Sequence, residues 1–103
     1  MRTGGRIILV DLATVDWIEA ADNYVRLHAR TGEYLLRETL AALERQLDPG
    51  RFARIHRSAI VQIDRITELH PASHGDMDVV LRSGKVLTLS RTWRDHVQRL
   101  FGG

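Results

Sequence analysis

The amino-acid sequence predicts a mainly β fold of short antiparallel strands, with one short mid-chain helix and a C-terminal helical segment. Residues 24–30 alternate between polar and apolar side chains, which is the period of a half-buried strand. The dipeptides Thr31-Gly32 and Ser83-Gly84 each separate two short apolar runs, as tight turns do in β-hairpins. Helical spacing of apolar residues is visible within 38–47 and 90–103, and this spacing predicts the two helical segments.

The first third of the chain predicts a hairpin preceded by two shorter apolar stretches. Residues 7–10 are apolar and β-branched, and residues 15–20 form a candidate strand that "ADN" interrupts. In the alternating strand, one face carries polar side chains and the other carries apolar ones, which indicates a sheet covered on one face. The polar face is Tyr24, Arg26, His28 and Arg30, and the apolar face is Val25, Leu27 and Ala29. Residues 33–37 return as the partner strand.

The pattern changes to a helix in "ETLAALERQL". Leu40, Leu43 and Leu47 recur at i, i+3 and i+7 among good helix formers, so an amphipathic helix is expected. Asp48-Pro49-Gly50 ends it. Residues 51–58 then form a basic connection that leads into the next strand.

The second half predicts strands at 59–63 and 65–70, a loop at 71–76, and a hairpin from 77–82 and 85–89. In "SRTWRDHVQRLFGG", Trp93, Val97, Leu100 and Phe101 lie at helical spacing. Ser90 is placed to cap the N-terminus of this helix. Trp93 is expected to pack the C-terminal segment onto the sheet.

Length and composition favour one small cytoplasmic domain, residues 1–103. The 103 residues can form one modest core. The absence of cysteine excludes disulfides and thiolate zinc sites and fits a cytoplasmic protein. The longest apolar run is too short to cross a membrane, and the N-terminus lacks a signal-peptide core.

The basic residues are almost all arginine. The net charge is only +2, but 14 of the 15 basic residues are arginine and one is lysine. The guanidinium fork suits phosphates and guanine edges, although codon usage in a GC-rich genome would produce the same bias. Composition therefore permits nucleic-acid binding and does not establish it.

Metal binding and catalysis are not favoured, and no cofactor is expected. His70 and His74 have the spacing of a helical zinc pair, and Asp76 and Asp78 follow, but Pro71 and Gly75 indicate a loop. Ser58, His56 and Asp64 supply the residue types of a catalytic triad. Triads are assembled across a fold, however, and neither a nucleophile elbow nor a phosphate-binding glycine loop is present.

Three segments have the chemistry that nucleic-acid binding requires. "ADNY" (21–24) offers an amide and a phenol, "RIHRS" (54–58) offers guanidiniums, an imidazole and a hydroxyl, and "SRTWR" (90–94) repeats this chemistry with an indole. Each segment alone is more typical of a solvated connection. Together they favour nucleic-acid binding only if the fold places them on one side of the molecule.

These segments carry a family resemblance. "NYVRLH", "LRETL..LE..L", "F.RIHRS.IV..D.I" and "L.LSR..RD" occur in this order. From about Arg6 to Phe101 the chain resembles the LytTR family of bacterial DNA-binding domains, found in response regulators of two-component systems. The resemblance implies an elongated arrangement of short antiparallel sheets. It also implies sequence-specific, non-enzymatic binding of double-stranded DNA, with loops and strand ends entering successive major grooves.

The resemblance also implies specific roles for residues of this chain. Arg57, from "IHRS", and Arg91, from "LSR", correspond to positions that contact bases in the family. A further base contact comes from residues 23–25, for which Asn23 and Tyr24 are favoured over Val25 because they carry donors. Phosphate or positioning roles are expected for the neighbouring polar side chains, which are Arg54, His56, Ser58, Ser90 and Arg94.

The implied partners are direct-repeat promoter DNA, a second copy of the domain on that DNA, and a receiver domain outside this chain. The sequence departs from many relatives, which read "HRSYIVN", at Ala59 and Gln62. Ala59 is expected to trim packing without moving Arg57, and Gln62 is expected to have little effect. The alternative function is a β-rich protein-interaction or dimerisation module, whose arginines would meet an acidic protein.

Overall fold

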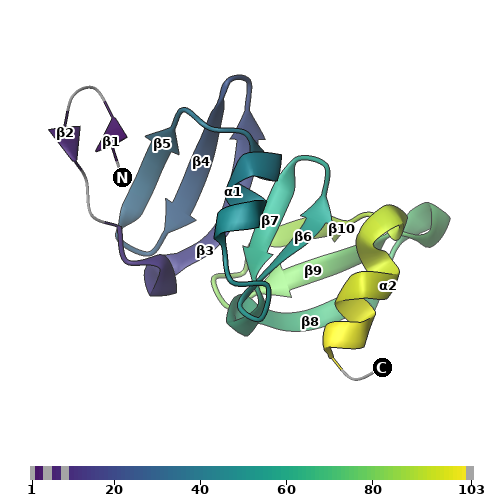
Figure 1. Cartoon of the computed structure of the whole chain (residues 1–103). Helices are drawn as coiled ribbons and strands as arrows, with labels where there is room; N and C mark the ends of the chain where they lie inside the picture. The colour runs from purple at the N-terminus through teal and green to yellow at the C-terminus, as the bar shows by residue number, and fades with distance from the viewer. Residues whose placement is uncertain (1, 4–5, 8–9, 102–103) are drawn as a thin grey trace.

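The computed structural model describes residues 2–3, 6–7 and 10–101 of the chain (Figure 1). The fold is mainly β, as the sequence predicted. A five-stranded and a three-stranded antiparallel sheet are joined through a shared core, with one short helix in mid-chain and one at the C-terminus. A minimal pair of two-residue strands, β1 (Arg2–Thr3) and β2 (Arg6–Ile7), precedes them. Of the predicted apolar stretch 7–10, residues 8 and 9 lie outside the described residues.

The five-stranded sheet has the strand order β5-β4-β3-β7-β6. Its strands are β3 (Val15–Ala21), β4 (Tyr24–Ala29), β5 (Gly32–Leu36), β6 (Phe52–His56) and β7 (Ala59–Gln62). The predicted alternation in β4 is confirmed, because Val25 and Leu27 are fully buried while Tyr24 is exposed. The β4–β5 turn falls on Arg30-Thr31, one residue earlier than predicted.

The three-stranded sheet has the order β10-β9-β8 and lies beside the first sheet (Figure 1). It consists of β8 (Ile66–Pro71), β9 (Met77–Leu81) and β10 (Val86–Leu89). Three short 3₁₀ turns connect strands of the domain: η1 (Leu12–Thr14), η2 (Ile63–Arg65) and η3 (Ser73–Gly75). The predicted hairpin around Ser83-Gly84 is confirmed by the antiparallel pairing of β9 with β10.

The two helices cover the sheets and begin at side-chain caps. In α1 (Leu40–Gln46), the hydroxyl of Thr39 accepts a hydrogen bond from the Ala42 N–H. In α2 (Arg91–Leu100), the hydroxyl of Ser90 accepts one from the Thr92 N–H, which confirms the predicted cap. None of the helices in the described part of the chain is long and apolar enough to span a membrane.

The core consists of two clusters that meet on opposite faces of β7. One cluster packs α1 against the five-stranded sheet and includes Ile18, Leu27 and Ile60. The other packs the three-stranded sheet and α2 against β6 and β7, and includes Ile55 and Val61. All four residues of β7 are therefore buried. The burial of β7 holds in place the two segments that flank it, which are residues 57–58 and η2.

Two expectations are corrected. Residues 51–58 are not a connection, because β6 occupies 52–56 and pairs with β7. Phe52, Ala53 and Ile55 supply buried apolar contacts that the interleaved arginines mask in the sequence. The arrangement is also compact rather than elongated, since the radius of gyration of 13.6 Å is close to the value of about 13 Å for a compact chain of this length.

Candidate nucleic-acid interface

Two hairpin turns lie at the same end of the five-stranded sheet. Asp22-Asn23 joins β3 to β4, and Arg57-Ser58 joins β6 to β7. Since β3 and β7 are antiparallel neighbours, the end of one strand meets the start of the other. The Ala20 N–H donates to the Ser58 carbonyl at 2.9 Å, so the two turns are adjacent (Figure 1).

A β-bulge brings the third segment to this end. The pairing of β6 with β7 shifts register between Arg54 and His56, which leaves Ile55 out of the ladder. The Ile55 carbonyl accepts a hydrogen bond of 2.8 Å from the Ser90 N–H instead. The first residue of α2, Arg91, is thereby held beside the β6–β7 turn.

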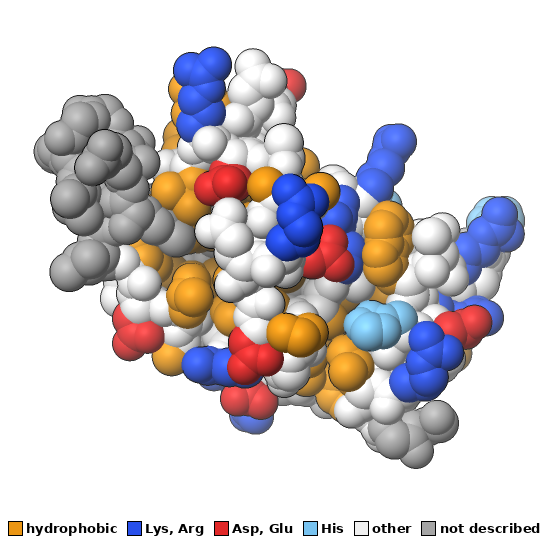
Figure 2. Space-filling model, in the orientation of Figure 1, with side chains coloured by type: hydrophobic (Ala, Val, Ile, Leu, Met, Phe, Trp, Pro, Cys, Tyr) orange, Lys and Arg blue, Asp and Glu red, His pale blue; other side chains and the backbone are white. Residues whose placement is uncertain are grey.

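The structure thus brings together the three segments singled out in the sequence. We call this surface the turn edge and define it by Asn23, Tyr24, Arg57, Ser58, Ser90 and Arg91. Basic side chains project at intervals along the upper margin of the molecule in Figure 2, the side on which the turns lie in Figure 1.

The candidate base-contacting side chains are exposed. Asn23, Arg57 and Arg91 are exposed, and Tyr24 is 41% exposed. Within the described residues, neither the Arg57 nor the Arg91 guanidinium has a hydrogen-bond or ion-pair partner. Val25, in contrast, is fully buried in the core below the turn, which leaves Asn23 and Tyr24 as the accessible residues of this segment.

His56 and Ser58 support the turn from within. The Nδ1 atom of His56 lies 2.8 Å from the Ser58 hydroxyl and accepts the Ser58 N–H at 3.2 Å. An Nδ1 that accepts a backbone N–H carries no proton, so this hydrogen-bond network assigns the proton to Nε2. Asp64 follows the opposite end of β7, so the three triad residue types are not brought together.

Arg54 and Arg94 use part of their hydrogen-bonding capacity inside the protein. Arg54 is 13% exposed and donates to the His56 and Arg57 carbonyls and to Glu44. The Arg94 Nη1 donates to the Gly75 carbonyl at 2.9 Å, while its side chain remains 39% exposed. Its buried Nε lacks a hydrogen-bond partner among the described residues.

The loop before β9 has a structural role that the sequence did not reveal. The Asp76 carboxylate, considered above as a metal ligand, accepts the Arg91 N–H at 2.9 Å and so anchors the start of α2. His70 contacts Glu68 at 2.9 Å. Across the described ranges, no three metal-ligating side chains gather into a site.

Gln62 also matters more to the fold than the sequence suggested. Its buried amide donates to the carbonyls of Leu12, Ala13 and Val15. The contact joins β7 to the turn before β3, some 50 positions away in the chain, a distance at which sequence spacing carries no information. Gln62 nevertheless stands at the end of β7 opposite the Arg57-Ser58 turn.

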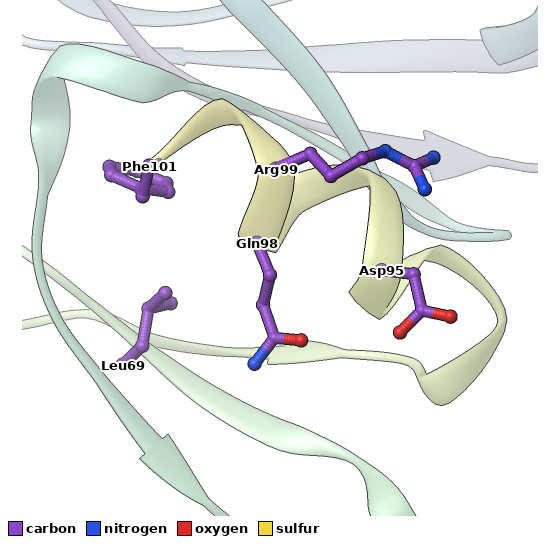
Figure 3. Close-up of a pocket in the computed structure, with 5 residues that line it drawn as sticks. All are labelled: Leu69, Asp95, Gln98, Arg99 and Phe101. Atoms are coloured by element: carbon purple, nitrogen blue, oxygen red, sulfur yellow. The ribbon is translucent and has the colours of Figure 1, made fainter. Parts of the chain in front are cut away.

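A hollow at the other end of α2 lacks the features of this edge. It has a volume of ≈ 440 Å³ and lies between β8 and the second half of α2 (Figure 3). Its lining mixes apolar and polar side chains, which are Leu69, Asp95, Gln98, Arg99 and Phe101. Arg99 is the one cation among the described residues that line it.

Comparison with known proteins places the chain in a family. Residues 5–102 match the model of the LytTr DNA-binding domain. A solved structure of the LytTr DNA-binding domain of a putative methyl-accepting/DNA response regulator from Bacillus cereus superposes with a TM-score of 0.87 at 24% identity. It covers 99% of this chain and 94% of that one, and it shows the same fold.

Curated relatives are longer proteins. The sensory transduction protein LytT of Bacillus anthracis is 29% identical over 94 residues, which are 91% of this chain and 38% of the relative. The positive alginate biosynthesis regulatory protein of Pseudomonas aeruginosa is 40% identical over 101 residues, which are 96% of this chain and 40% of the relative. The chain spans about two fifths of the length of these two proteins, and the match to the family model covers almost all of it. The chain therefore belongs to the LytTR family of DNA-binding domains.

Proposed function

We propose that this domain binds double-stranded DNA sequence-specifically, by inserting the turn edge into successive major grooves. The observation that carries the proposal is the position of Arg57 and Arg91. Both are exposed, and the guanidiniums of both lack partners among the described residues. Both belong to the turn edge, Arg57 in the β6–β7 turn and Arg91 at the start of α2, which the Ser90–Ile55 hydrogen bond holds to β6. The enzyme alternative on His56, Ser58 and Asp64 is set aside, because the family is one of DNA-binding domains.

Hairpin turns suit a major groove in size. The groove is about 12 Å wide and admits a two-stranded ribbon. Asp22-Asn23 and Arg57-Ser58 are two-residue turns of such ribbons. Asp22 adopts a φ of 55°, a left-handed conformation that Asp tolerates better than most residues, and this allows the tight turn that presents Asn23 and Tyr24.

The side chains divide into two roles. Arg57 and Arg91 read bases, most simply guanine through O6 and N7, and Asn23 and Tyr24 make a further base contact. Neutral or partly engaged donors around them bind phosphates or position the turns. This second set consists of Arg54, His56, Ser58, Ser90 and Arg94.

At the level of the whole protein, we propose a cytoplasmic bacterial transcription regulator. The domain, residues 1–103, binds direct-repeat promoter sites as a dimer on DNA. A receiver or other sensor domain in the same protein controls it. The greater length of the curated relatives supports a further domain.

The test begins with selection of binding sites from a random duplex pool, which gives the consensus and the repeat spacing. Binding of the selected duplex is then compared for the unmodified domain, Arg57→Ala and the control Arg51→Ala. Arg51 is exposed and precedes β6 at the end opposite the turn. Arg57→Ala is expected to flatten the preference at one base position by about 1–3 kcal/mol, while Arg51→Ala keeps it.

Unchanged affinity and preference in Arg57→Ala contradict the assignment. Salt would also weaken the binding of an acidic protein to the same arginines. Salt dependence alone therefore does not distinguish a DNA-binding domain from a protein-interaction module. Competition between selected and random duplex separates the two functions, because a protein-interaction module would show no preference for the selected sequence.

A further inference from the structure

Arg54 is the arginine of "RIHRS" that does not face solvent. Its side chain is 13% exposed, and the three guanidinium nitrogens are all engaged. Nε donates to the His56 carbonyl at 2.7 Å, and Nη2 donates to the Arg57 carbonyl at 2.7 Å. Nη1 donates to the Glu44 carboxylate of α1 at 2.9 Å.

These contacts place one rigid group between the β6–β7 turn and both helices. The two carbonyls belong to the residue before the turn and to the first turn residue. The guanidinium carbon also lies 5.3 Å from the ring centroid of Trp93 in α2, within the range of a cation–π contact. Only a planar fork with several fixed donors can satisfy these partners together.

We propose that Arg54 is a positioning residue that pre-forms the Arg57 turn and does not itself contact DNA. The proposal rests on the function proposed above, in which Arg57 reads a base. Its charge is balanced by Glu44, and each of its nitrogens already has a partner. Three of its five N–H groups bond the turn and Glu44, and the side chain is 13% exposed, so little of the guanidinium is open to a phosphate.

Pre-formation has a specific consequence. A turn that is already ordered in the free domain loses little conformational entropy on binding DNA. A mobile turn must be ordered on the DNA, and this cost lowers the specific affinity. Non-specific binding depends on charge rather than on the position of one side chain. Loss of the hydrogen bonds from the Arg54 guanidinium to the turn should therefore reduce specific binding and leave non-specific binding unchanged.

The test uses Arg54→Lys, which keeps the charge and removes the fork. In the free domain, backbone amide relaxation and hydrogen exchange at Arg57 and Ser58 should report a more mobile turn. On the selected duplex, affinity should fall about tenfold, the order expected for one lost charge-assisted hydrogen bond. Affinity for random duplex and the dependence of log K on log salt should stay unchanged.

A phosphate-contacting Arg54 predicts different results. Lysine also binds phosphate as a point charge, so Arg54→Lys would keep its affinity, and Arg54→Gln would lower the salt slope by about one unit. That pair of results overturns the proposal. So do unchanged amides at Arg57 and Ser58 in Arg54→Lys.

Two controls separate this inference from the function proposed above. Arg51 is exposed, so Arg51→Lys should leave the mobility of the turn amides and the DNA affinity unchanged. Glu44→Gln removes the ion pair but keeps both carbonyl contacts, so it should have a smaller effect in the same direction as Arg54→Lys. If the turn becomes mobile while specific affinity persists, the pre-formation proposal fails, whereas the base contact of Arg57 is tested separately by Arg57→Ala.

Discussion

The two ends of the five-stranded sheet use arginine in opposite ways. At the turn edge, the Arg57 guanidinium has no protein partner among the described residues. At the other end, Arg65 and Arg30 approach the nearly buried Asp16 carboxylate at 2.9 and 3.5 Å.

This difference separates the arginines that are paired within the fold from those whose donors are available, and position on the turn edge distinguishes Arg57 and Arg91 from exposed arginines elsewhere, such as Arg51. An arginine whose fork is satisfied by a carboxylate contributes to the fold. An exposed arginine with free donors, held on a rigid element, is available to phosphates and base edges. The bias towards arginine noted in the sequence therefore mixes both uses, and the contacts separate them.

The largest effect on stability is expected at the paired end. Asp16→Ala leaves Arg65, which is 22% exposed, without its carboxylate partner, and should lower the free energy of unfolding by about 2–3 kcal/mol. Chemical denaturation measures this change. The folded variant should keep its sequence preference, and a loss of preference at full folding would break the distinction between the two ends.

The converse effect is expected at the turn edge. Arg91→Ala should flatten the preference at one base position by about 1–3 kcal/mol, at a position different from that affected by Arg57→Ala. Thermal unfolding should change little, because the Arg91 side chain has no partner within the described structure and its N–H contact to Asp76 is kept. A site selection repeated with the variant checks both parts. If Arg91→Ala lowers the stability but keeps the base preference, Arg91 supports the fold and does not contact a base.

Arg94 lies between the two uses of arginine, because it bonds the Gly75 carbonyl and is still 39% exposed. Arg94→Ala should weaken the binding of selected and random duplexes alike. It should also reduce the slope of log K against log salt by about one unit. Titrations at several salt concentrations measure the slope. Arg99→Ala in the second half of α2 is the matched control, and an equal change in slope there would remove the special role of Arg94.

The smallest effect is expected on the outer face of the sheet. Glu33 approaches Arg26 at 3.3 Å and His28 at 3.4 Å, but its side chain is 58% exposed. Exposed pairs contribute little, so Glu33→Gln should change stability by less than about 0.5 kcal/mol and leave DNA preference intact. Denaturation and binding assays with Glu33→Gln set the baseline for Asp16→Ala, Arg91→Ala and Arg94→Ala. A large effect of Glu33→Gln would show that the outer face of the sheet has a further role.

Local patterns in the sequence predicted much of the fold, and contacts distant in the chain account for what they missed. Alternation in β4, the leucine spacing of α1 and the Ser90 cap are properties of neighbouring residues, and the structure confirms them. Strand β6 was missed because arginines and a bulge interrupt its alternation. The Gln62 contacts with residues 12–15 and the Asp76 anchor of α2 depend on folding, so no local pattern contains them.

For the candidate site, the sequence identified the three segments but not their arrangement. Spacing in the chain cannot show that residues 23, 57 and 91 share one end of the molecule. The pairing of β3 with β7 and the Ser90–Ile55 hydrogen bond bring them together. The distinct contacts of Arg54 and Arg57, three positions apart, also emerge only from the folded hairpin.

The central claim is that DNA is bound at the end of the sheet where the arginines are free. Amide NMR spectra of the domain, titrated with a selected duplex, test it residue by residue. We expect the largest shift changes at residues 22–24, 56–58 and 90–92, and small ones at Asp16, Gln62 and Arg65. Changes centred on the Asp16 end, or on the hollow between β8 and α2, would contradict the claim.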